Sequence, residues 1–179
     1  FLRLLREQTE RLTRMTKTLL EMSSLQQVAR NEHIQLAPMI EEIFTDLAPL
    51  AEKSGVSLGR DGDGVMTGSD ALIYRLLFNL TENAVKYNHL GGSVRISVEQ
   101  ESETLLIRVS DTGCGIPEKF QRSIFQPFFR VDKSRGREYG GAGLGLSLVW
   151  EIANLHGGCV WVEESTKKGT TIAVELPAQ

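Results

Sequence analysis

The sequence predicts an α+β protein: a two-layer α/β sandwich of helices and a mostly antiparallel sheet, preceded by a long N-terminal helix. Three features support this fold class. Residues 1–28 contain no Gly or Pro and repeat apolar residues at helical spacing. Several later segments alternate apolar and polar residues over short runs, as strands do. Other segments, before and between these strands, carry the apolar stripe of a helix.

The first helix, expected from residue 1 to about residue 28, carries an apolar seam. Steps of three and four residues give it the a and d positions of a heptad. The apolar members of the seam are Phe1, Leu5, Leu12, Met15, Leu19 and Met22. A helix packed on its own domain would have a similar stripe, but the polar flanks and the separate unit that follows favour a partner helix. We therefore expect two units, residues 1–28 and residues 29–179.

Turn-forming residues divide the second unit into shorter elements. Helices are expected from residue 38 to just before Gly55, from Ser69 or Asp70 to about Asn88, and from about residue 144 to 156. Pro38 suits a first helical turn, and Pro49 should kink or shorten the same helix. Strands are expected at residues 56–58, 65–67, 94–98, 105–109, 159–164 and 170–176. The first two strands flank a turn at residues 60–64, and the last two form a hairpin.

Composition limits the classes of function. A chain of 179 residues allows one domain or one domain plus an appendage, and its apolar and charged content is ordinary for a globular protein. The net charge of −3 gives no sign of a nucleic-acid or membrane surface. Cys114 and Cys159 lack metal-ligand spacing, and no apolar run reaches the roughly 20 residues that cross a bilayer. Because the chain starts within a helical pattern at Phe1, we expect a piece of a longer protein.

The helix expected from residue 70 carries a polar stripe beside its apolar one. Asn79, Glu82, Asn83 and Lys86 follow i, i+3, i+4, i+7 spacing and so share one face. A solvated face is the ordinary explanation, but each mid-helix Asn costs about 0.5 kcal/mol relative to Ala. Amide and carboxylate oxygens suit Mg²⁺, and a lysine one turn away suits phosphate oxygens. The stripe is therefore a candidate metal and phosphate site.

A second candidate site follows the strand expected at residues 105–109. Asp111 ends this apolar segment, and Gly113 and Gly115 permit a tight turn and the close approach of a ligand. The carboxylate can accept a hydrogen bond from the exocyclic amine of adenine, where guanine presents a carbonyl oxygen. Two acceptors left facing each other cost roughly 1–3 kcal/mol or more. A simple turn would explain Asp-Thr-Gly alone, but beside the other motifs it favours ATP over GTP.

A glycine cluster opens the helix expected from about residue 144. Backbone N–H groups at a helix N-terminus form an anion site, and Gly141, Gly143 and Gly145 would leave it open to phosphate. No Gly-Lys-Ser/Thr follows, and no βαβ unit surrounds the cluster, so the Walker and Rossmann patterns are excluded. The preceding segment, residues 116–143, is expected to cover the nucleotide as a lid.

The chain thus contains four motifs in the following order: Asn79-Leu-Thr-Glu82-Asn83-Ala-Val-Lys86-Tyr87, Asp111-Thr-Gly113-Cys-Gly115, Phe125-Gln-Pro-Phe128-Phe129-Arg130 and Gly141-Ala-Gly143-Leu-Gly145-Leu. Together they resemble the ATP-binding domain of sensor histidine kinases. The resemblance spans about residues 31–177 and, more loosely, residues 1–28. It implies the sandwich fold that these kinases share with type II topoisomerases, mismatch-repair ATPases and a heat-shock chaperone. Ala142 departs from the family's common Thr, which removes one possible hydroxyl contact.

The resemblance also implies a role for each metal- and phosphate-binding position. Asn79 and Asn83 would bind Mg²⁺ and phosphate, and Glu82 would orient metal-bound water. Lys86 and Tyr87 would contact the phosphates.

For the base and the reacting phosphate, the resemblance implies a further set. Asp111 would bind adenine, with support from Thr170 in a later strand. Arg130 would reach the γ-phosphate and act as a catalytic residue together with Glu82 and Lys86. The other positions implied to bind ATP are Gly113, Gly115, Ile116, Gly141, Gly143, Leu144, Gly145 and Leu146.

The implied activity is transfer of the γ-phosphoryl group of ATP to a histidine, for relay to an aspartate of a response regulator. In the family, the acceptor histidine is followed by an acidic residue on a dimerisation helix; His33, His89 and His156 are not, so the acceptor is expected on an upstream helix. Residues 1–28 resemble the second helix of the dimerisation hairpin. The resemblance therefore implies a homodimeric, membrane-anchored bacterial sensor, with this portion in the cytoplasm and without nucleic acid as a partner.

Two alternatives to the kinase stay open. One is an ATP-hydrolysing protein of the same fold, in which Glu82 activates water. The other is a nucleotide-binding scaffold without kinase activity.

Overall fold

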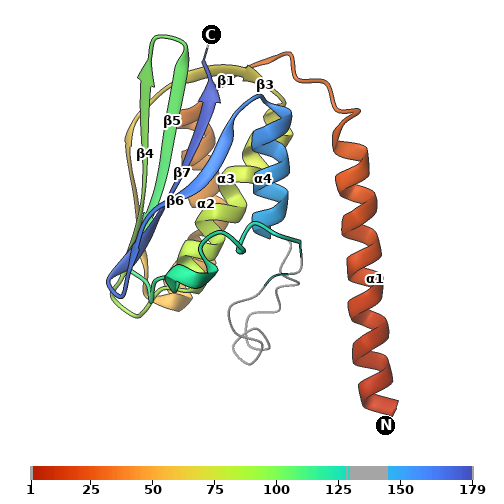
Figure 1. Cartoon of the computed structure of the whole chain (residues 1–179). Helices are drawn as coiled ribbons and strands as arrows, with labels where there is room; N and C mark the ends of the chain where they lie inside the picture. The colour runs from red at the N-terminus through yellow and green to blue at the C-terminus, as the bar shows by residue number, and fades with distance from the viewer. Residues whose placement is uncertain (1, 128, 130–144, 179) are drawn as a thin grey trace.

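The computed structural model describes residues 2–127, 129 and 145–178. Figure 1 shows two layers, with three helices on one face of a five-stranded sheet and a long helix, α1, beside them. The helices are α1 (Leu2–Leu25), α2 (Leu36–Ser54), α3 (Asp70–Lys86) and α4 (Gly145–Leu155). This arrangement confirms the predicted α/β sandwich with an N-terminal helix.

The main sheet has the strand order β2-β4-β5-β7-β6. Its strands are β2 (Ser57–Gly62), β4 (Ser93–Glu101), β5 (Thr104–Asp111), β7 (Gly169–Pro177) and β6 (Cys159–Thr166). β2 runs parallel to β4, and the other neighbours are antiparallel. A separate two-stranded ladder joins β1 (Glu32–Gln35) to β3 (Val65–Gly68). The hairpins β4–β5 and β6–β7 therefore lie side by side, joined through β5 and β7.

The hydrophobic core lies between the sheet and the helices. From α3, Ile73, Leu76 and Leu77 are completely buried, and Ile96 and Ile107 meet this layer from β4 and β5. Buried residues alternate along both strands, so every second side chain points toward the helices. Burying one Leu or Ile side chain contributes roughly 1.5–3 kcal/mol. This layer therefore decides which face α3 turns toward the sheet.

The ends of α3 agree with the sequence within two residues. Ser69 caps its start, because its hydroxyl accepts a hydrogen bond from the Leu72 N–H at 3.4 Å. The helix ends at Lys86, slightly before the predicted end. Asn88 lies beyond it, and its side-chain amide donates to the Ser93 carbonyl at 3.0 Å.

Pro49 does not shorten α2, so that part of the prediction was wrong. The helix continues to Ser54 and ends at Gly55, whose φ of 63° suits glycine. Leu47 and Ala51 flank the proline and are both buried in the core. Their burial holds the two halves of the helix in place despite the missing N–H of proline.

The N-terminal strands also differ from the predictions. β1 is absent from the sequence predictions, because its four residues include a single buried one, Ile34. The predicted start of the turn at residues 60–64 was wrong, because residues 60–62 belong to β2. Asp and Gly favour turns locally, but β4 supplies a complete parallel partner, and Arg95 of β4 pairs with Asp61. Pairing over a long distance in sequence overrides the local preference.

The C-terminal end of α1 packs against the sandwich. Leu25 is buried, and Glu21 forms an ion pair of 2.8 Å with Arg75 of α3. Figure 1 shows the rest of α1 extending beside the sandwich. Three residues of its predicted apolar seam are exposed: Leu5, Leu12 and Leu19. Within the described ranges, no helix is both long enough and apolar enough to cross a membrane.

His156 connects the end of α4 to the start of α3. Its Nδ1 lies 2.8 Å from the Ile152 carbonyl, and its Nε2 accepts a hydrogen bond from the Ser69 N–H at 3.0 Å. These contacts require the neutral ring with the proton on Nδ1. Burial lowers the pKa of His156, and the nearby positive charge of Arg30 acts in the same direction.

We expect this contact to make folding stability depend on pH. The pKa of His156 is lower in the folded chain than the ordinary 6.5, so the unfolded chain binds more protons. The free energy of unfolding should therefore fall as pH drops from above 6.5 through the folded-state pKa. Urea unfolding between pH 7.5 and pH 5 measures this slope. His156→Gln should flatten it, and His89→Gln, at an exposed histidine, should not. Equal slopes in the wild type and His156→Gln would contradict the assignment.

Candidate functional site

The predicted polar stripe of α3 faces the N-terminus of α4. A β-carbon placed on Gly145 would lie 3.7 Å from Oδ1 of Asn79 and 3.9 Å from Nδ2 of Asn83. Both amides therefore border the first turn of α4, where the backbone N–H groups have no partner within the helix. These N–H groups and the helix dipole favour an anion at this position.

The next turn of the same α3 face carries an ion pair. Lys86 Nζ lies 2.9 Å from Oε1 of Glu82, and both side chains are largely shielded from solvent. The pair is an i, i+4 contact, so the helix itself holds the two groups together. The Lys86 ammonium is thus paired with Glu82, on the same face of the helix as Asn79 and Asn83.

Asp111 lies at the end of β5, and one of its two carboxylate oxygens is hydrogen-bonded to backbone. Its Oδ1 accepts hydrogen bonds from the Gly113 N–H at 2.8 Å and from the Thr170 N–H at 3.3 Å. Burial nevertheless raises the pKa of Asp111, and the two backbone bonds only partly offset this effect. Within the described part of the chain, Oδ2 receives no hydrogen bond. A partly buried carboxyl whose pKa is raised and whose second oxygen is available as an acceptor is a candidate for a binding site.

The turn after β5 packs tightly between α3 and the β6–β7 hairpin. The Cys114 N–H donates to the Tyr87 carbonyl at 3.4 Å. Gly115 has a φ of 75°, and a β-carbon there would overlap the Thr166 carbonyl. Backbone from both neighbours therefore fixes the position of this turn beside Asp111.

The other predicted residues differ in their contacts and in their exposure to solvent. The Ile116 N–H donates to Ser165 Oγ at 2.7 Å, Leu146 packs on the core, and the Tyr87 side chain is exposed. The predicted positions that lie outside the described residues are Phe128, Arg130, Gly141, Gly143 and Leu144. The proposed lid over residues 116–143 is likewise described only in its first part.

Two residues beside the site are absent from the sequence predictions. Asn88 accepts a hydrogen bond from the Thr112 hydroxyl at 3.1 Å and so ties the end of α3 to the turn after Asp111. Ser165 shares a hydrogen bond of 2.8 Å with Thr170. A polar residue directly after a helix could have signalled Asn88, but nothing local to the sequence around Ser165 indicates its partner.

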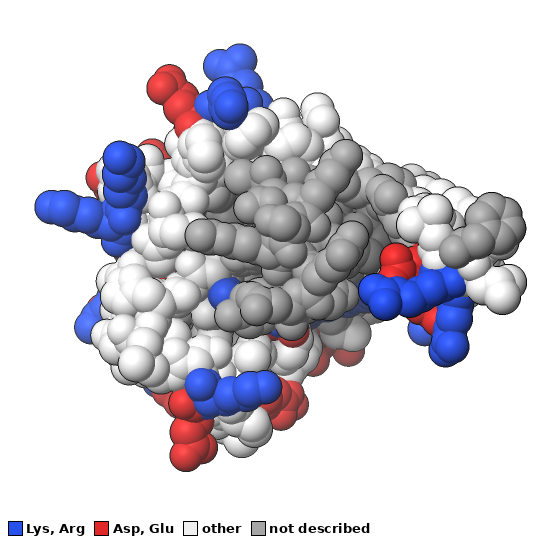
Figure 2. Space-filling model, turned by 90° about the horizontal axis from the view of Figure 1, so that it is seen from below, with Lys and Arg blue, Asp and Glu red and all other residues white. Residues whose placement is uncertain are grey.

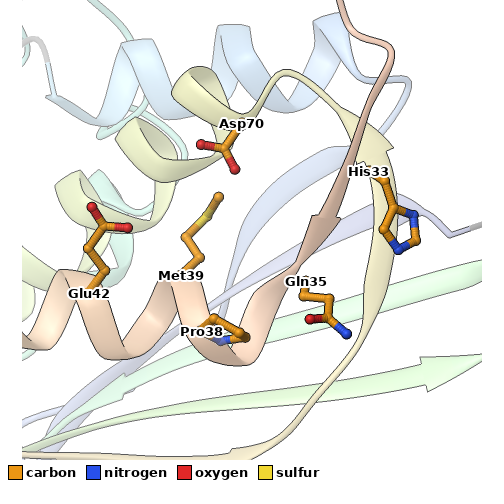
Figure 3. Close-up of a pocket in the computed structure, with 6 residues that line it drawn as sticks. All are labelled: His33, Gln35, Pro38, Met39, Glu42 and Asp70. Carbon is orange, nitrogen blue, oxygen red and sulfur yellow. The ribbon is translucent and has the colours of Figure 1, made fainter.

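A separate surface pocket of about 300 Å³ lies at the other end of α3, near its first residue. Its lining is His33, Gln35, Pro38, Met39, Glu42 and Asp70, as Figure 3 shows. None of the predicted site residues lines it, and it has no glycine turn that would admit a phosphate. The candidate functional site is therefore the Asp111 and Asn79 end of the sandwich.

Charge on the surface agrees with the near-neutral composition. On the described part of the face shown in Figure 2, basic and acidic side chains alternate around the edge without one sign dominating. In the residues that the structure describes, no three His, Cys, Asp or Glu side chains gather as metal ligands.

Gly113 offers a direct test of the packing around Asp111. A β-carbon there would lie 2.5 Å from the Tyr87 carbonyl oxygen and 2.9 Å from Asp111 Oδ1. Because the first contact is with backbone, we expect Gly113→Ala to lower the free energy of unfolding by about 1–3 kcal/mol. Gly59→Ala is the matched control, since its β-carbon would meet nothing within 4 Å. Urea unfolding should show a change within about 0.5 kcal/mol for the control. Equal stability of both variants would show that the turn is not confined as described.

Comparison with known proteins places this site in a family. The model of the family described as "Histidine kinase-, DNA gyrase B-, and HSP90-like ATPase" matches residues 68–179. Sensor histidine kinase WalK of Bacillus subtilis is 36% identical over 185 residues, which cover 99% of this chain and 30% of that protein. Sensor histidine kinase RppB of Synechocystis is 33% identical over 176 residues, covering 95% of this chain and 39% of that protein. The chain thus spans about a third of the length of these relatives.

Solved structures agree with this assignment. The catalytic domain of histidine kinase ThkA superposes with a TM-score of 0.73 at 25% identity, covering 84% of this chain and 97% of that one. Full-length ShkA in complex with AMPPNP superposes with a TM-score of 0.77 at 21% identity, covering 98% of this chain and 38% of that one, and so supports the fold. Since the family match covers more than half of the chain and includes the whole Asp111 and Asn79 site, this chain belongs to the histidine kinase-, DNA gyrase B- and HSP90-like ATPases.

Proposed function

We propose that this chain is the catalytic portion of a sensor histidine kinase. It would bind Mg-ATP and transfer the γ-phosphoryl group to a histidine on a dimerisation helix, for relay to an aspartate of a response regulator. One observation carries the proposal: the partly buried Asp111, whose Oδ2 receives no hydrogen bond from the described residues, and the polar helix face at Asn79 flank one end of the same sandwich, beside the first turn of α4.

Asp111 would select the base. Its Oδ1 is occupied by two backbone N–H groups, so the free Oδ2 is the acceptor available to the exocyclic amine of adenine. Guanine would present a carbonyl oxygen to the same carboxylate, and a buried acceptor facing another acceptor is disfavoured by roughly 1–3 kcal/mol or more. The closely packed backbone around Gly113 and Gly115 would hold this oxygen in place before the base arrives.

The polar face of α3 would hold the phosphates and their metal ion. The amide oxygens of Asn79 and Asn83 fit Mg²⁺, with the remaining ligands coming from phosphate oxygens and water. The bound Mg²⁺ would neutralise charge on the phosphates. Lys86 would exchange its contact with Glu82 for a phosphate oxygen, and the first turn of α4 would donate N–H groups to the same anion. By resemblance, Arg130 would contact the γ-phosphate.

In the proposed phosphoryl transfer, the catalytic portion itself forms no covalent bond. A neutral imidazole nitrogen would bond to the γ-phosphorus while the bond from that phosphorus to the ADP oxygen breaks. Positioning and charge neutralisation then supply most of the rate enhancement.

The partners would be a second copy of the protein and a response regulator. The exposed seam of α1 suits a helical hairpin and its symmetry mate, which agrees with residues 1–28 being the second helix of a dimerisation domain. ThkA, whose complex with the response regulator TrrA superposes with a TM-score of 0.76, has the same fold. We propose that the whole protein is a membrane-anchored sensor with this portion in the cytoplasm.

Asp111→Asn tests base selection without removing side-chain volume. Asparagine keeps an Oδ1 for the Gly113 and Thr170 N–H groups but replaces Oδ2 with a donor, which would face the donor of adenine. We expect ATP affinity to fall about tenfold or more, and the preference for ATP over GTP to shrink. The raised pKa of Asp111 means that its ionised form opposes folding above that pKa, so the variant should melt no lower than the wild type at pH 7.

Calorimetric titration with ATP and GTP measures the effect, and a melting curve checks the fold. Asp61→Asn, on the exposed β2, is the matched control and should bind ATP like the wild type. Unchanged ATP affinity in Asp111→Asn would mean that the carboxylate serves only the turn.

Phosphoryl transfer tests the activity as a whole. The chain, given γ-labelled ATP, Mg²⁺ and a helical hairpin whose histidine precedes an acidic residue, should transfer acid-labile, base-stable label to that histidine. Asn79→Ala should lower the rate roughly a hundredfold, the scale of losing a group that positions the reacting phosphate. Glu101→Gln, on the exposed end of β4, should not change it. Phosphate release without transfer would favour the hydrolase alternative, and label on His33, His89 or His156 would contradict an upstream acceptor.

A further inference from the structure

A β-bulge in β6 decides which side chain lies opposite Thr170. Val162 pairs with Ile172, but the next pairs are Glu164 with Thr171 and Ser165 with Thr170. Glu163 is therefore the extra residue of β6. A regular ladder would have put Glu164, a charged residue, opposite Thr170. Bulges commonly re-aim a side chain beside a functional site.

The bulge is held from the neighbouring hairpin. Arg108 of β5 donates from Nε to both carboxylate oxygens of Glu163, at 3.0 and 2.8 Å. The other arm of the guanidinium binds Glu99 of β4 at 3.0 Å. The extra residue of β6 is thus anchored on the face of the sheet away from the helices, while Ser165 turns toward them.

The resulting register makes one polar row across three strands. Asp111 of β5 pairs with Thr170 of β7, and Thr170 pairs with Ser165 of β6. Residues directly opposite each other in antiparallel strands share a face of the sheet. Asp111, Thr170 and Ser165 therefore line up on the face that carries the proposed base site. Thr170 is buried, which leaves little competition from water for its hydroxyl.

Hydrogen bonds along this row connect the turn after Asp111 to Thr170. The Ile116 N–H donates to Ser165 Oγ at 2.7 Å, and Ser165 Oγ lies 2.8 Å from Thr170 Oγ1. Each hydroxyl has one proton. Either hydroxyl could therefore donate across this distance. If Thr170 donated to Ser165, its proton would not be available to a ligand. If Ser165 donates to Thr170, the Thr170 proton remains available to a ligand beside Asp111.

This direction matches the edge of adenine. Beside the exocyclic amine, which donates, adenine carries the ring nitrogen N1, which accepts. Asp111 Oδ2 offers the matching acceptor and a Thr170 hydroxyl oriented by Ser165 offers the matching donor. Accepting a bond from the Ile116 N–H also polarises the Ser165 hydroxyl and strengthens its own donation.

We propose that Ser165, aimed by the bulge at Glu163, is a positioning residue that orients the Thr170 hydroxyl to donate to N1 of adenine. The proposal rests on the nucleotide-binding function proposed above. It assigns Ser165 no contact with the nucleotide. Its effect on affinity should therefore depend on whether the ligand has an N1 acceptor.

The experiment compares ATP with 1-deaza-ATP, in which a C–H group replaces N1, by calorimetric titration of the chain with Mg²⁺ present. Wild type should bind ATP about three- to tenfold more tightly than 1-deaza-ATP, the range expected for one hydrogen bond. Ser165→Ala should lose this difference: its ATP affinity should fall by about the same factor, while its affinity for 1-deaza-ATP should change less than about twofold. Ser165→Thr, which retains a hydroxyl, should restore the preference for ATP.

Glu164→Ala, on the exposed side of the same strand, is the matched control and should keep the wild-type preference. Equal loss of both nucleotides in Ser165→Ala would overturn the proposal, because it would mean that Ser165 only supports the turn through Ile116. No loss of either nucleotide would overturn it as well. A wild-type chain that binds neither nucleotide would instead contradict the proposed function. Melting curves of each variant show whether the fold is retained.

Discussion

The site depends on the burial of one stripe of α3. Leu72, Ile73, Leu76, Leu77, Leu80 and Ala84 are buried along this helix. Each large member contributes roughly 1.5–3 kcal/mol, whereas each Asn on the neighbouring polar stripe costs about 0.5 kcal/mol in helix propensity. Burial therefore outweighs propensity and fixes the rotation of the helix about its axis. With this rotation fixed, the polar stripe faces the start of α4.

α4 is fastened to α3 at the opposite end. His156, just after α4, accepts the backbone N–H of Ser69 at the cap of α3, so the two helices run antiparallel. The first turn of α4, at Gly145, consequently lies against the amides near the C-terminal end of α3. The anchor and the anion site are thus separated by the length of one helix.

The sequence predicts the parts of this arrangement that have strong periodicity. α3, α4 and the strands of both hairpins were predictable because their apolar stripes and alternation arise from burial of one face. The parallel pairing of β2 with β4 was not, since it depends on a partner about 35 residues away, Ser57 opposite Ser93. Turn-forming Asp and Gly residues there gave a misleading local signal.

The residues at the candidate site likewise divide into those that the sequence predicts and those that it does not. Asn79, Glu82, Asn83 and Lys86 could be placed on one face from helical spacing alone, and Asp111 from its place after an apolar strand. Ser165 could not, because its position opposite Thr170 exists only after the bulge at Glu163 shifts the register. A one-residue shift changes which face every following side chain occupies. Sequence patterns indicate which side chains share a face of an element. They do not reveal a β-bulge, such as the one at Glu163, that a tertiary contact with Arg108 stabilises.

The two halves of the site meet at the end of α3. The Tyr87 carbonyl accepts a hydrogen bond from the Cys114 N–H, and the Asn88 side chain accepts one from the Thr112 hydroxyl. The end of the helix that carries Asn79 and Asn83 therefore also supports the turn beside Asp111. Burial of the Asp111 carboxylate is unfavourable by itself, as its raised pKa indicates. Its orientation is maintained because backbone from α3, β6 and β7 surrounds the turn. A ligand amine would meet an acceptor already fixed in position, in surroundings where a hydrogen bond to a charge is stronger than in water. If Asp111 binds adenine as we propose, rigid support of this partly buried group is the physical basis of base selection.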